Sequence, residues 1–289
     1  MISCVFLVSW RVRVTPRPSG GKEYLSHRGT DEKQTVKAFL LAAGHGTRLR
    51  PLTDQTPKCL VPIRGVPLLL IWLEICRQQG VDEVLVNLHA QAQRVRDFLA
   101  ATHVDIRVRL FEEPTLLGSA GTLRANRNWV ESEPSFWVFY ADILTTANLT
   151  RMADFHQQHQ GVATLGVCQV PDPTRSGIVV VNEVGVIRQF IEKPENPPGN
   201  LAFGGILLAR PELLESIPEK VPADLSREVL PLLVNRMSAF PITDYHLDIG
   251  TLESYRAAQT AWPGLAASSA ALPKPEVIPA RAPTVAAPG

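Results

Sequence analysis

Two glycines and two cations lie together near the start of the regularly patterned part of the sequence. Gly44 and Gly46 are followed by Arg48, and Lys58 comes ten residues after the arginine. Glycines let backbone N–H groups surround phosphate oxygens at positions where a Cβ would collide. An arginine can bind two phosphate oxygens at once, and a lysine adds a mobile point charge. The spacing predicts a phosphate-binding loop, with an ordinary solvated surface loop as the alternative.

This loop matches neither of the two common phosphate-binding motifs. Leu49 occupies the third glycine position of the dinucleotide fingerprint, and no Gly-Lys-Ser/Thr follows at the spacing of a Walker loop. The sequence therefore excludes these two nucleotide-binding classes at this position.

Two aspartates stand where a metal ion could be held. Asp142 ends a strand-like run, and Asp248, 106 residues later, follows another. Carboxylates are the ligands that Mg²⁺ prefers, so the pair predicts a magnesium site. The alternative is that each aspartate caps a helix or a turn.

The elements that must position these residues alternate along the chain. Apolar runs and helical periodicity predict strands and helices in the order strand 37–43, helix 67–79, strand 84–88, helix 91–101, strand 106–111, helix 122–130 and strand 136–140. This alternation predicts a parallel sheet with right-handed crossovers, and residues 177–181 and 184–190 predict a hairpin. The expected fold is α/β, a Rossmann-like three-layer α/β/α sandwich with a mostly parallel, mixed sheet. Ligands of such sheets bind at the carboxyl ends of the strands.

Composition limits the classes of partner. The 289 residues hold 29 Lys and Arg against 28 Asp and Glu, which argues against a polybasic nucleic-acid-binding protein. Four cysteines without metal-ligand spacing predict free thiols, and no apolar run is long enough to span a membrane. The apolar start lacks the charge order and cleavage site of a signal peptide, so we expect a cytoplasmic protein.

The pattern predicts one folded body with two unpatterned ends. Residues 1–36 read as a flexible extension, residues 37–262 as the folded body, and residues 263–289 as a Pro/Ala-rich disordered tail.

The run from Leu41 to Pro62, Leu-Ala-Ala-Gly-His-Gly-Thr-Arg-Leu-Arg-Pro-Leu-Thr…Pro-Lys…Pro, resembles the defining motif of the sugar-1-phosphate nucleotidyltransferases. The resemblance implies a GT-A-like nucleotidyltransferase fold, with a nucleoside triphosphate (NTP) and a sugar-1-phosphate as substrates. It implies catalytic roles for Arg48 and Lys58 and a Mg²⁺ site at Asp142 and Asp248. The residues that it assigns to nucleotide binding are Leu41, Ala42, Ala43, Gly44, Gly46, Thr47, Glu113 and Gly118.

Two later motifs extend the resemblance. Glu112 to Thr122 is similar to the family's second nucleotide element, in which the positions of Glu113 and Gly118 face the base. Its Glu-Glu-Pro…Gly-Ser-Ala-Gly form resembles the mannose-1-phosphate guanylyltransferase branch. A simple helix start capped by Ser119 is the alternative reading of these residues.

The second later motif, Phe190 to Pro194, resembles the sugar-phosphate element, with Gly177, Glu192 and Lys193 as its binding residues. An exposed ion pair is the alternative for Glu192 and Lys193. The sequence departs from the family pattern at Tyr140, Phe203 and His246, where Asn, Asn and Trp are common. These departures concern the sugar pocket more than the metal site.

We expect synthesis of a nucleotide sugar and pyrophosphate, with GTP and mannose-1-phosphate as the preferred pair. Heptose-1-phosphate guanylyl transfer and N-acetylmuramate-1-phosphate uridylyl transfer are alternatives, and a homo-oligomer is left open. A GT-A glycosyltransferase would need Asp-x-Asp, which Asp142-Ile143-Leu144 lacks. A regulatory homologue without turnover would be expected to lose the cations or carboxylates that are present here.

Overall fold

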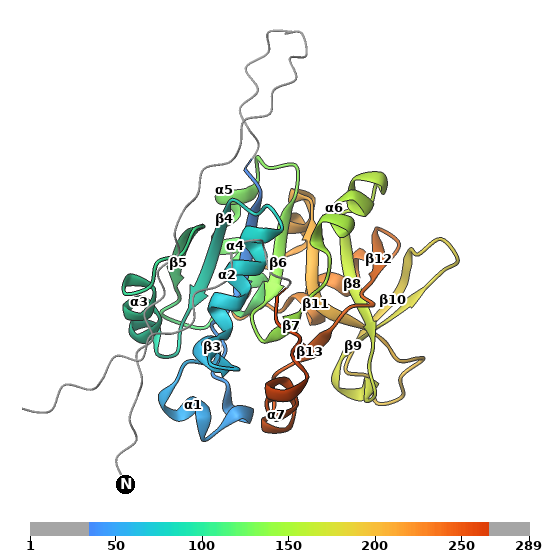
Figure 1. Cartoon of the computed structure of the whole chain (residues 1–289). Helices are drawn as coiled ribbons and strands as arrows, with labels where there is room; N and C mark the ends of the chain where they lie inside the picture. Colours follow the sequence, from blue (N-terminus) through green and yellow to red (C-terminus); the bar gives the residue numbers. More distant parts are fainter. Residues whose placement is uncertain (1–34, 266–289) are drawn as a thin grey trace, which may run out of the picture.

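The structure is a computed structural model that describes residues 35–265, and its centre is one mixed β-sheet (Figure 1). In the described residues the main sheet has the strand order β10-β9-β11-β6-β1-β4-β5, with β8 and β12 continuing from β11. The strands are β1 (Lys37–Leu41), β4 (Glu83–Leu88), β5 (Arg107–Glu112), β6 (Phe136–Tyr140), β8 (Ala163–Gln169), β9 (Gly177–Val181), β10 (Ile187–Glu192), β11 (Leu201–Ala209) and β12 (Met237–Pro241).

Parallel pairing dominates one half of this sheet. β6, β1, β4 and β5 run parallel, while β11 is antiparallel to β6 and to β8. Two small sheets join β2 (Pro62–Ile63) with β3 (Val66–Pro67) and β7 (Ile143–Thr145) with β13 (His246–Asp248).

Helices cover both faces of the sheet. One face carries α2 (Leu68–Gln78), α3 (Ala92–Ala100), α6 (Leu149–Gln158) and α7 (Leu252–Ala261), and the other carries α4 (Gly118–Ala125) and α5 (Arg127–Val130). The short α1 (Leu52–Gln55) lies in the loop after β1. The predicted three-layer α/β/α sandwich with a mostly parallel, mixed sheet is confirmed.

Side chains of the buried strands point alternately to the two faces of the sheet, so a hydrophobic core forms on each face. Trp72 stacks on Phe139 at 4.8 Å between ring centroids on one face, and Phe39 meets Phe136 edge to face on the other. Trp72 also donates a buried 2.8 Å hydrogen bond to the Ile143 carbonyl, which satisfies its indole N–H. This bond ties α2 to β7, which follows the carboxyl end of β6.

Two predicted boundaries are wrong. The helix expected over 122–130 begins at Gly118 and is interrupted at Asn126, whose side-chain amide donates to the Thr122 carbonyl. The second arm of the hairpin begins at Ile187, not at residue 184, because residues 182–186 form a turn. Gly185 has φ +78° there, and its N–H donates to the Asn182 carbonyl.

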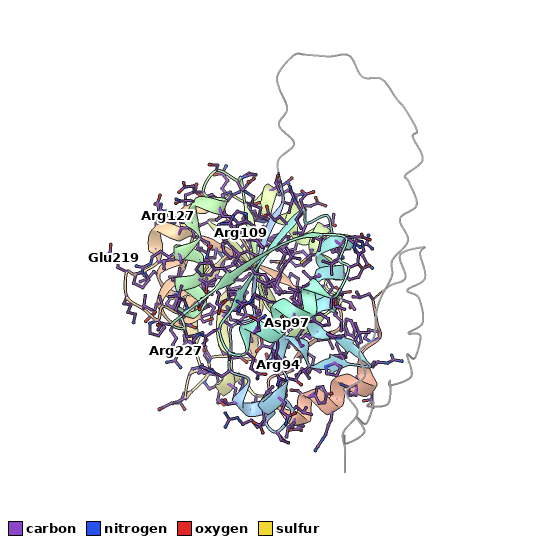
Figure 2. All side chains as sticks on the ribbon, turned by 90° about the vertical axis from the view of Figure 1, so that its left-hand side faces the viewer. Arg94, Asp97, Arg109, Arg127, Glu219 and Arg227 are labelled. Atoms are coloured by element: carbon purple, nitrogen blue, oxygen red, sulfur yellow. The ribbon has the colours of Figure 1, made fainter. Side chains whose placement is uncertain are left out.

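The strand β5 forms one edge of the main sheet. Its outward positions carry Arg107 and Arg109, and Arg94 and Asp97 on α3 lie on the same side of the molecule (Figure 2). Charged side chains along an edge strand discourage pairing with another chain.

Among the described residues, no helix is both long enough and apolar enough to cross a membrane. The expectations for residues 1–34 and 266–289 lie outside the described residues. Between them, β1 begins at Lys37 and α7 ends at Ala261.

Candidate active site

The glycine loop after β1 has a backbone that only a glycine accepts easily. Gly46 has φ +65°, and a Cβ there would stand 2.9 Å from Thr53 Cγ2 and 3.1 Å from Lys58 Cβ. The buried Thr53 hydroxyl donates to the Gly46 carbonyl at 2.8 Å and fixes the turn. Gly46 thus lets the chain fold back closely enough to bring Lys58 beside the loop.

Lys58 and Asp142 form an ion pair, with 2.6 Å between Lys58 Nζ and Asp142 Oδ2. Lys58 begins a 3-10 turn (Lys58–Leu60), and Asp142 follows the end of β6. Because β1 and β6 are parallel neighbours, the loop after one strand meets the residues after the other. The ion pair thus brings these two predicted residues together.

Asp248 reaches the same site from the far end of the sequence. In the β7–β13 pair Asp248 lies opposite Ile143, and the Ile249 N–H donates to the Asp142 carbonyl at 2.9 Å. Asp248 keeps contact with solvent on one side, but loss of hydration on the other side raises its pKa above the usual value. The neighbouring Asp142 carboxylate raises this pKa further, while Lys58 and Arg48 oppose the rise.

Arg48 completes this group of four charged residues. Its side chain is exposed and its Nη2 atom lies 2.7 Å from the point where a Cβ of Gly250 would be, beside Asp248. α7 holds the end of the loop that follows β1, because Tyr255 and Gln259 of α7 both donate to the Pro62 carbonyl. Figure 1 shows α7 next to α1 at this end of the molecule.

The donor set fits Mg²⁺. Asp142 and Asp248 offer hard carboxylate oxygens, and within the described residues no group of three or more His, Cys, Asp or Glu side chains could hold a metal. Mg²⁺ commonly binds through one or two carboxylates and completes its shell with water and substrate phosphates. Two carboxylates beside two cations are therefore suited to a metal that arrives with a phosphate ligand.

Glu113 lies beneath the loops instead of at their surface. It is 1% exposed, and it accepts hydrogen bonds from Asn87 Nδ2 (2.8 Å), Thr122 Oγ1 (2.5 Å) and the Leu117 N–H (2.9 Å). Asn87 Oδ1 in turn accepts a 2.6 Å bond from the Ala42 N–H. The buried carboxylate thus links the strand end before the glycine loop to the start of α4.

The start of α4 is closed by a segment that the sequence did not point to. The Ala223 carbonyl accepts from the N–H groups of Ala120 and Gly121, and the Ala223 N–H donates to the Leu117 carbonyl. Gly118 has φ +80°, and a Cβ there would collide with the Ala223 carbonyl oxygen. The required glycine at 118 is explained by this close approach of two backbones.

The alternative of a helix capped by Ser119 is wrong. The Ser119 hydroxyl donates to Asp224 Oδ2 at 3.1 Å and accepts from the Leu225 N–H at 2.7 Å. It therefore fastens α4 to the π-helix Leu225–Val229 and does not cap α4 itself. Only a tertiary contact between residues about 105 positions apart makes this segment part of the site, so no local pattern could have found it.

The predicted sugar-phosphate residues lie at the open ends of β9 and β10. Gly177 and Glu192 are register partners, and a Cβ on Gly177 would stand 2.7 Å from Phe190 Cζ and 3.0 Å from Glu192 Oε2. Lys193 has φ +48° and lies 3.4 Å from Glu192 Oε1 through its Nζ atom. Glycine at 177 leaves room for the Glu192 carboxylate over the sheet.

The three departures from the family pattern meet around one stretch of β11. The Phe203 and Tyr140 rings meet edge to face at 5.9 Å, and a Cβ on Gly204 would stand 2.8 Å from His246 Nε2. Burial lowers the pKa of His246 to about 4, so its ring is neutral at neutral pH. The side chains that differ from the common pattern therefore form one local group.

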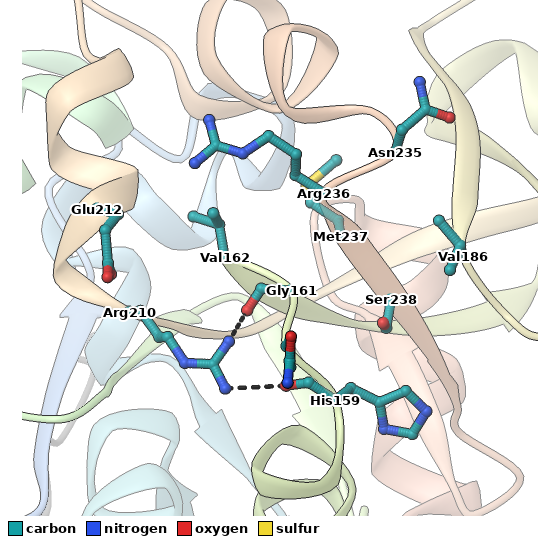
Figure 3. Close-up of a pocket in the computed structure, with 11 residues that line it drawn as sticks. His159, Gly161, Val162, Val186, Arg210, Glu212, Asn235, Arg236, Met237 and Ser238 are labelled. Atoms are coloured by element: carbon teal, nitrogen blue, oxygen red, sulfur yellow. Dashed lines mark hydrogen bonds between the residues drawn. The ribbon is translucent and has the colours of Figure 1, made fainter.

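A separate cavity of about 500 Å³ opens at the opposite edge of the sheet, near the starts of β8 and β12 (Figure 3). Two arginines, Arg210 and Arg236, line it, and Arg210 donates to the Gly161 carbonyl and, at 2.8 Å, to the His159 carbonyl. Arg48, Lys58, Asp142 and Asp248 do not line this cavity. The cavity is therefore separate from the candidate active site.

The protein is thus of the α/β class, and it carries a cluster of two cations and two carboxylates at the strand ends. The chain belongs to the Nucleotidyl transferase family, whose sequence profile matches residues 37–263. This confirms the family resemblance found in the sequence.

The chain is similar in sequence to mannose-1-phosphate guanylyltransferases. The chain is 34% identical over 228 residues to mannose-1-phosphate guanylyltransferase 1 of Arabidopsis thaliana, covering 76% of this chain and 63% of the relative. It is 33% identical over 221 residues to the mannose-1-phosphate guanylyltransferase catalytic subunit beta of Drosophila melanogaster, covering 74% and 59%. The chain thus spans less than two thirds of the length of these relatives.

Solved structures share the fold. HddC from Yersinia pseudotuberculosis superposes with a TM-score of 0.67 at 24% identity, over 79% of this chain and all of that chain. UDP-glucose pyrophosphorylase from Acinetobacter baumannii superposes with a TM-score of 0.68 at 19% identity, over 78% of this chain and 92% of that chain.

Proposed function

We propose that the protein joins a nucleoside triphosphate to a sugar-1-phosphate, releasing pyrophosphate, and that its preferred pair is GTP and mannose-1-phosphate. The observation that carries the proposal is the meeting of Arg48, Lys58, Asp142 and Asp248 at the strand ends. The guanylyltransferase relatives support the choice of this substrate pair.

The reaction needs no protein nucleophile. An oxygen of the sugar phosphate, already an anion at neutral pH, attacks the α-phosphorus of the triphosphate. The bond from this phosphorus to the bridging oxygen breaks, and pyrophosphate leaves with the electron pair. Catalysis then depends on positioning and on stabilising charge.

The residues divide these tasks between them. Arg48 and Lys58 bind the triphosphate oxygens and stabilise the negative charge that grows on the leaving pyrophosphate. Asp142 and Asp248 would hold Mg²⁺, which supplies Lewis-acid stabilisation of phosphate oxygens when bound.

The remaining predicted residues position the two substrates. Glu192 accepts hydrogen bonds from sugar hydroxyls, and Lys193 pairs with the sugar phosphate. In our proposal Glu113 acts from beneath, because its hydrogen bonds fix the glycine loop and the Gly118 turn where the nucleotide binds.

Turnover measurements test the proposal. Purified full-length protein is incubated with each of the four nucleoside triphosphates and with mannose-1-phosphate, glucose-1-phosphate, heptose-1-phosphate and N-acetylmuramate-1-phosphate, with Mg²⁺ or with EDTA. We expect pyrophosphate release to be fastest with GTP and mannose-1-phosphate and to require the metal. Faster release with another pair would refute the substrate assignment, and nucleotide-sugar binding without turnover of any pair would favour a regulatory protein.

A further inference from the structure

The cavity near the starts of β8 and β12 is lined by two arginines whose charges are not paired within the part of the chain that the structure describes (Figure 3). Among the described residues, neither Arg210 nor Arg236 forms an ion pair, and the exposed guanidinium group of Arg236 has no hydrogen-bond partner. One acidic residue, Glu212, belongs to the lining, and it is exposed. Positive charge therefore exceeds negative charge in this cavity.

The backbone holds the Arg210 side chain in place. Its guanidinium group donates to the carbonyls of Gly161, of His159 at 2.8 Å and of His156 at 3.5 Å. Carbonyl oxygens orient a guanidinium group but carry no net charge, so the positive charge of Arg210 remains. A guanidinium group has five N–H donors, and these bonds leave further donors available. Arg210 thus supplies a preoriented cation in the wall of the cavity.

Ser238 adds a polar group without a partner to the same cavity. The residue is 4% exposed, and its hydroxyl has no hydrogen-bond partner among the described residues. Its oxygen is not among the polar atoms that are closed off from solvent, so it is open to the cavity that Ser238 lines. A hydroxyl that is almost buried and unpaired costs free energy comparable to a lost hydrogen bond. Such a group is suited to a ligand that enters the cavity.

The strand β12 places Ser238 on the same face of the sheet as Arg236. Side chains two residues apart in a strand project from the same face, and the intervening Met237 belongs to the core on the opposite face. Figure 3 shows the guanidinium groups of both arginines on the Glu212 side of the cavity and Ser238 on the other side. A ligand that fills the cavity would meet cations at one end and a hydroxyl at the other.

The chemistry of the lining selects a class of ligand. Guanidinium groups bind phosphate oxygens through charged hydrogen bonds, and the Ser238 and Glu212 oxygens can bond hydroxyl groups. The volume of about 500 Å³ exceeds that of a bare ion and lies within the range of small-molecule sites, about 300–1,000 Å³. Glu212 would repel a ligand that carries several negative charges at its end of the cavity. The lining therefore fits a small molecule with one phosphate group and several hydroxyl groups.

We propose that this cavity is a second ligand site, which binds a hydroxyl-bearing phosphate monoester. Arg236 binds the phosphate group, Arg210 adds its fixed positive charge, and the Ser238 hydroxyl bonds a hydroxyl of the ligand. None of the four charged residues of the candidate active site lines the cavity, so the inference does not depend on the proposed function.

Calorimetric titration of the full-length protein with ribose-5-phosphate tests the proposal, with ribose and inorganic phosphate as comparison ligands. We expect ribose-5-phosphate to bind more tightly than either. Arg236→Ala should weaken its binding about tenfold and Ser238→Ala about fivefold, the losses of a charged and of a neutral hydrogen bond. The matched control is Arg151→Ala, which removes an exposed arginine of α6 outside the cavity and should bind as the wild type does.

Two further measurements separate ligand binding from a structural role. Glu212→Gln removes a repelling carboxylate, so it should tighten the binding of ribose-5-phosphate about twofold, which damage to the fold would not do. Ser238→Ala removes an unpaired hydroxyl, so the Tm of this variant without ligand should equal or exceed that of the wild type. Weaker binding by Glu212→Gln, or unchanged binding by Arg236→Ala, would overturn the proposal.

Lys58→Ala separates the cavity from the candidate active site. Ribose-5-phosphate should bind this variant as it binds the wild type, and should shift the backbone amide NMR signals of residues 159–162 and 235–238 but not those of residues 44–48. Loss of binding in Lys58→Ala alone would place the ligand at the candidate active site and overturn the proposal. Absence of binding by the wild type, or equal affinity for inorganic phosphate, would also overturn it. None of these results depends on turnover, so the proposed function stands or fails separately.

Discussion

The buried Glu113 carboxylate, between Glu112 and Pro114 in the sequence, connects several elements of the fold. Three donors converge on its two oxygens, and one of them, Asn87, also holds the backbone of Ala42. An amide in place of this carboxylate must turn its N–H₂ group toward donors that the carboxylate oxygens now accept from.

Glu113→Gln should therefore disturb both stability and catalysis. We expect the free energy of unfolding to fall by about 1–3 kcal/mol, because the new amide N–H₂ faces the donors that the carboxylate accepted. Urea unfolding measures this, with Glu112→Gln as the control, since Glu112 is exposed and pairs only with Arg96 in the described structure. Equal stability of the two variants would contradict the network.

Lys58→Ala should separate chemistry from folding. Lys58 and Asp142 form a partly buried pair, so Lys58→Ala should lower the Tm but leave the protein folded, whereas the loss of a positioned cation lowers turnover by about 10² to 10³. Lys220→Ala is the control, because this exposed lysine pairs with Glu228 away from the four charged residues. Pyrophosphate release by Lys58→Ala at near wild-type rate would exclude Lys58 from catalysis.

The contact between the start of α4 and the segment around Ala223 makes a glycine at 118 indispensable. In Gly118→Ala the new methyl group would meet the Ala223 carbonyl oxygen, and the left-handed φ adds strain. We expect a loss of more than about 1 kcal/mol in the free energy of unfolding, together with weaker nucleotide binding.

Gly199→Ala is the matched control for this change. No atom lies within 4 Å of the place where its Cβ would be, and its φ is not left-handed, so we expect a change within about 0.5 kcal/mol. Chemical denaturation of both variants decides the point. Equal destabilisation of the two would show that the approach of Ala223 is not what position 118 requires.

The sequence alone predicted those elements whose signal is local. The buried strands β1, β4 and β6 are mostly apolar, and α2 has helical spacing ended by Gly80, so their types were predicted correctly. The three-residue strands β7 and β13 are too short for any periodic signal. Their pairing joins residues about 100 positions apart and becomes visible only in the folded chain.

The candidate site follows the same rule: residues with a local sequence signal were predicted, and residues placed only by tertiary contacts were missed. Arg48, Lys58, Asp142 and Asp248 were predicted to lie together, and the structure brings them together. Ala223 and Asp224 were missed, because nothing in their own residue types marks them and only their contacts with α4 connect them to the site. The buried state of Glu113 likewise depends on donors from β4 and α4.

For the whole molecule, one buried histidine sets an acid limit on stability. His156 is 3% exposed, and burial, then Arg210 and His159, lower its pKa to about 4. The folded protein keeps this ring neutral, while the unfolded chain binds a proton below about pH 6.5. The stability that His156 contributes is therefore complete above pH 6.5 and is lost as the pH falls toward 4.

Urea unfolding at pH 7.5 and pH 5.0 measures this effect. We expect the wild type to lose on the order of 1 kcal/mol more than His156→Gln between the two values, because glutamine does not titrate. His103→Gln, which removes an exposed histidine, should keep the pH dependence of the wild type. The same dependence in His156→Gln and the wild type would contradict the assignment.

The ion pair between Lys58 and Asp142 also bears on the order in which ligands arrive. A metal ion that comes alone must displace an ammonium group from a carboxylate, and a nucleotide that comes alone must draw Lys58 away from Asp142. A metal–triphosphate complex meets neither obstacle, since it gives Asp142 a new cation and Lys58 a new anion in a single exchange of counter-ions. We therefore expect the complex, and neither of its parts, to be the species that the resting protein captures.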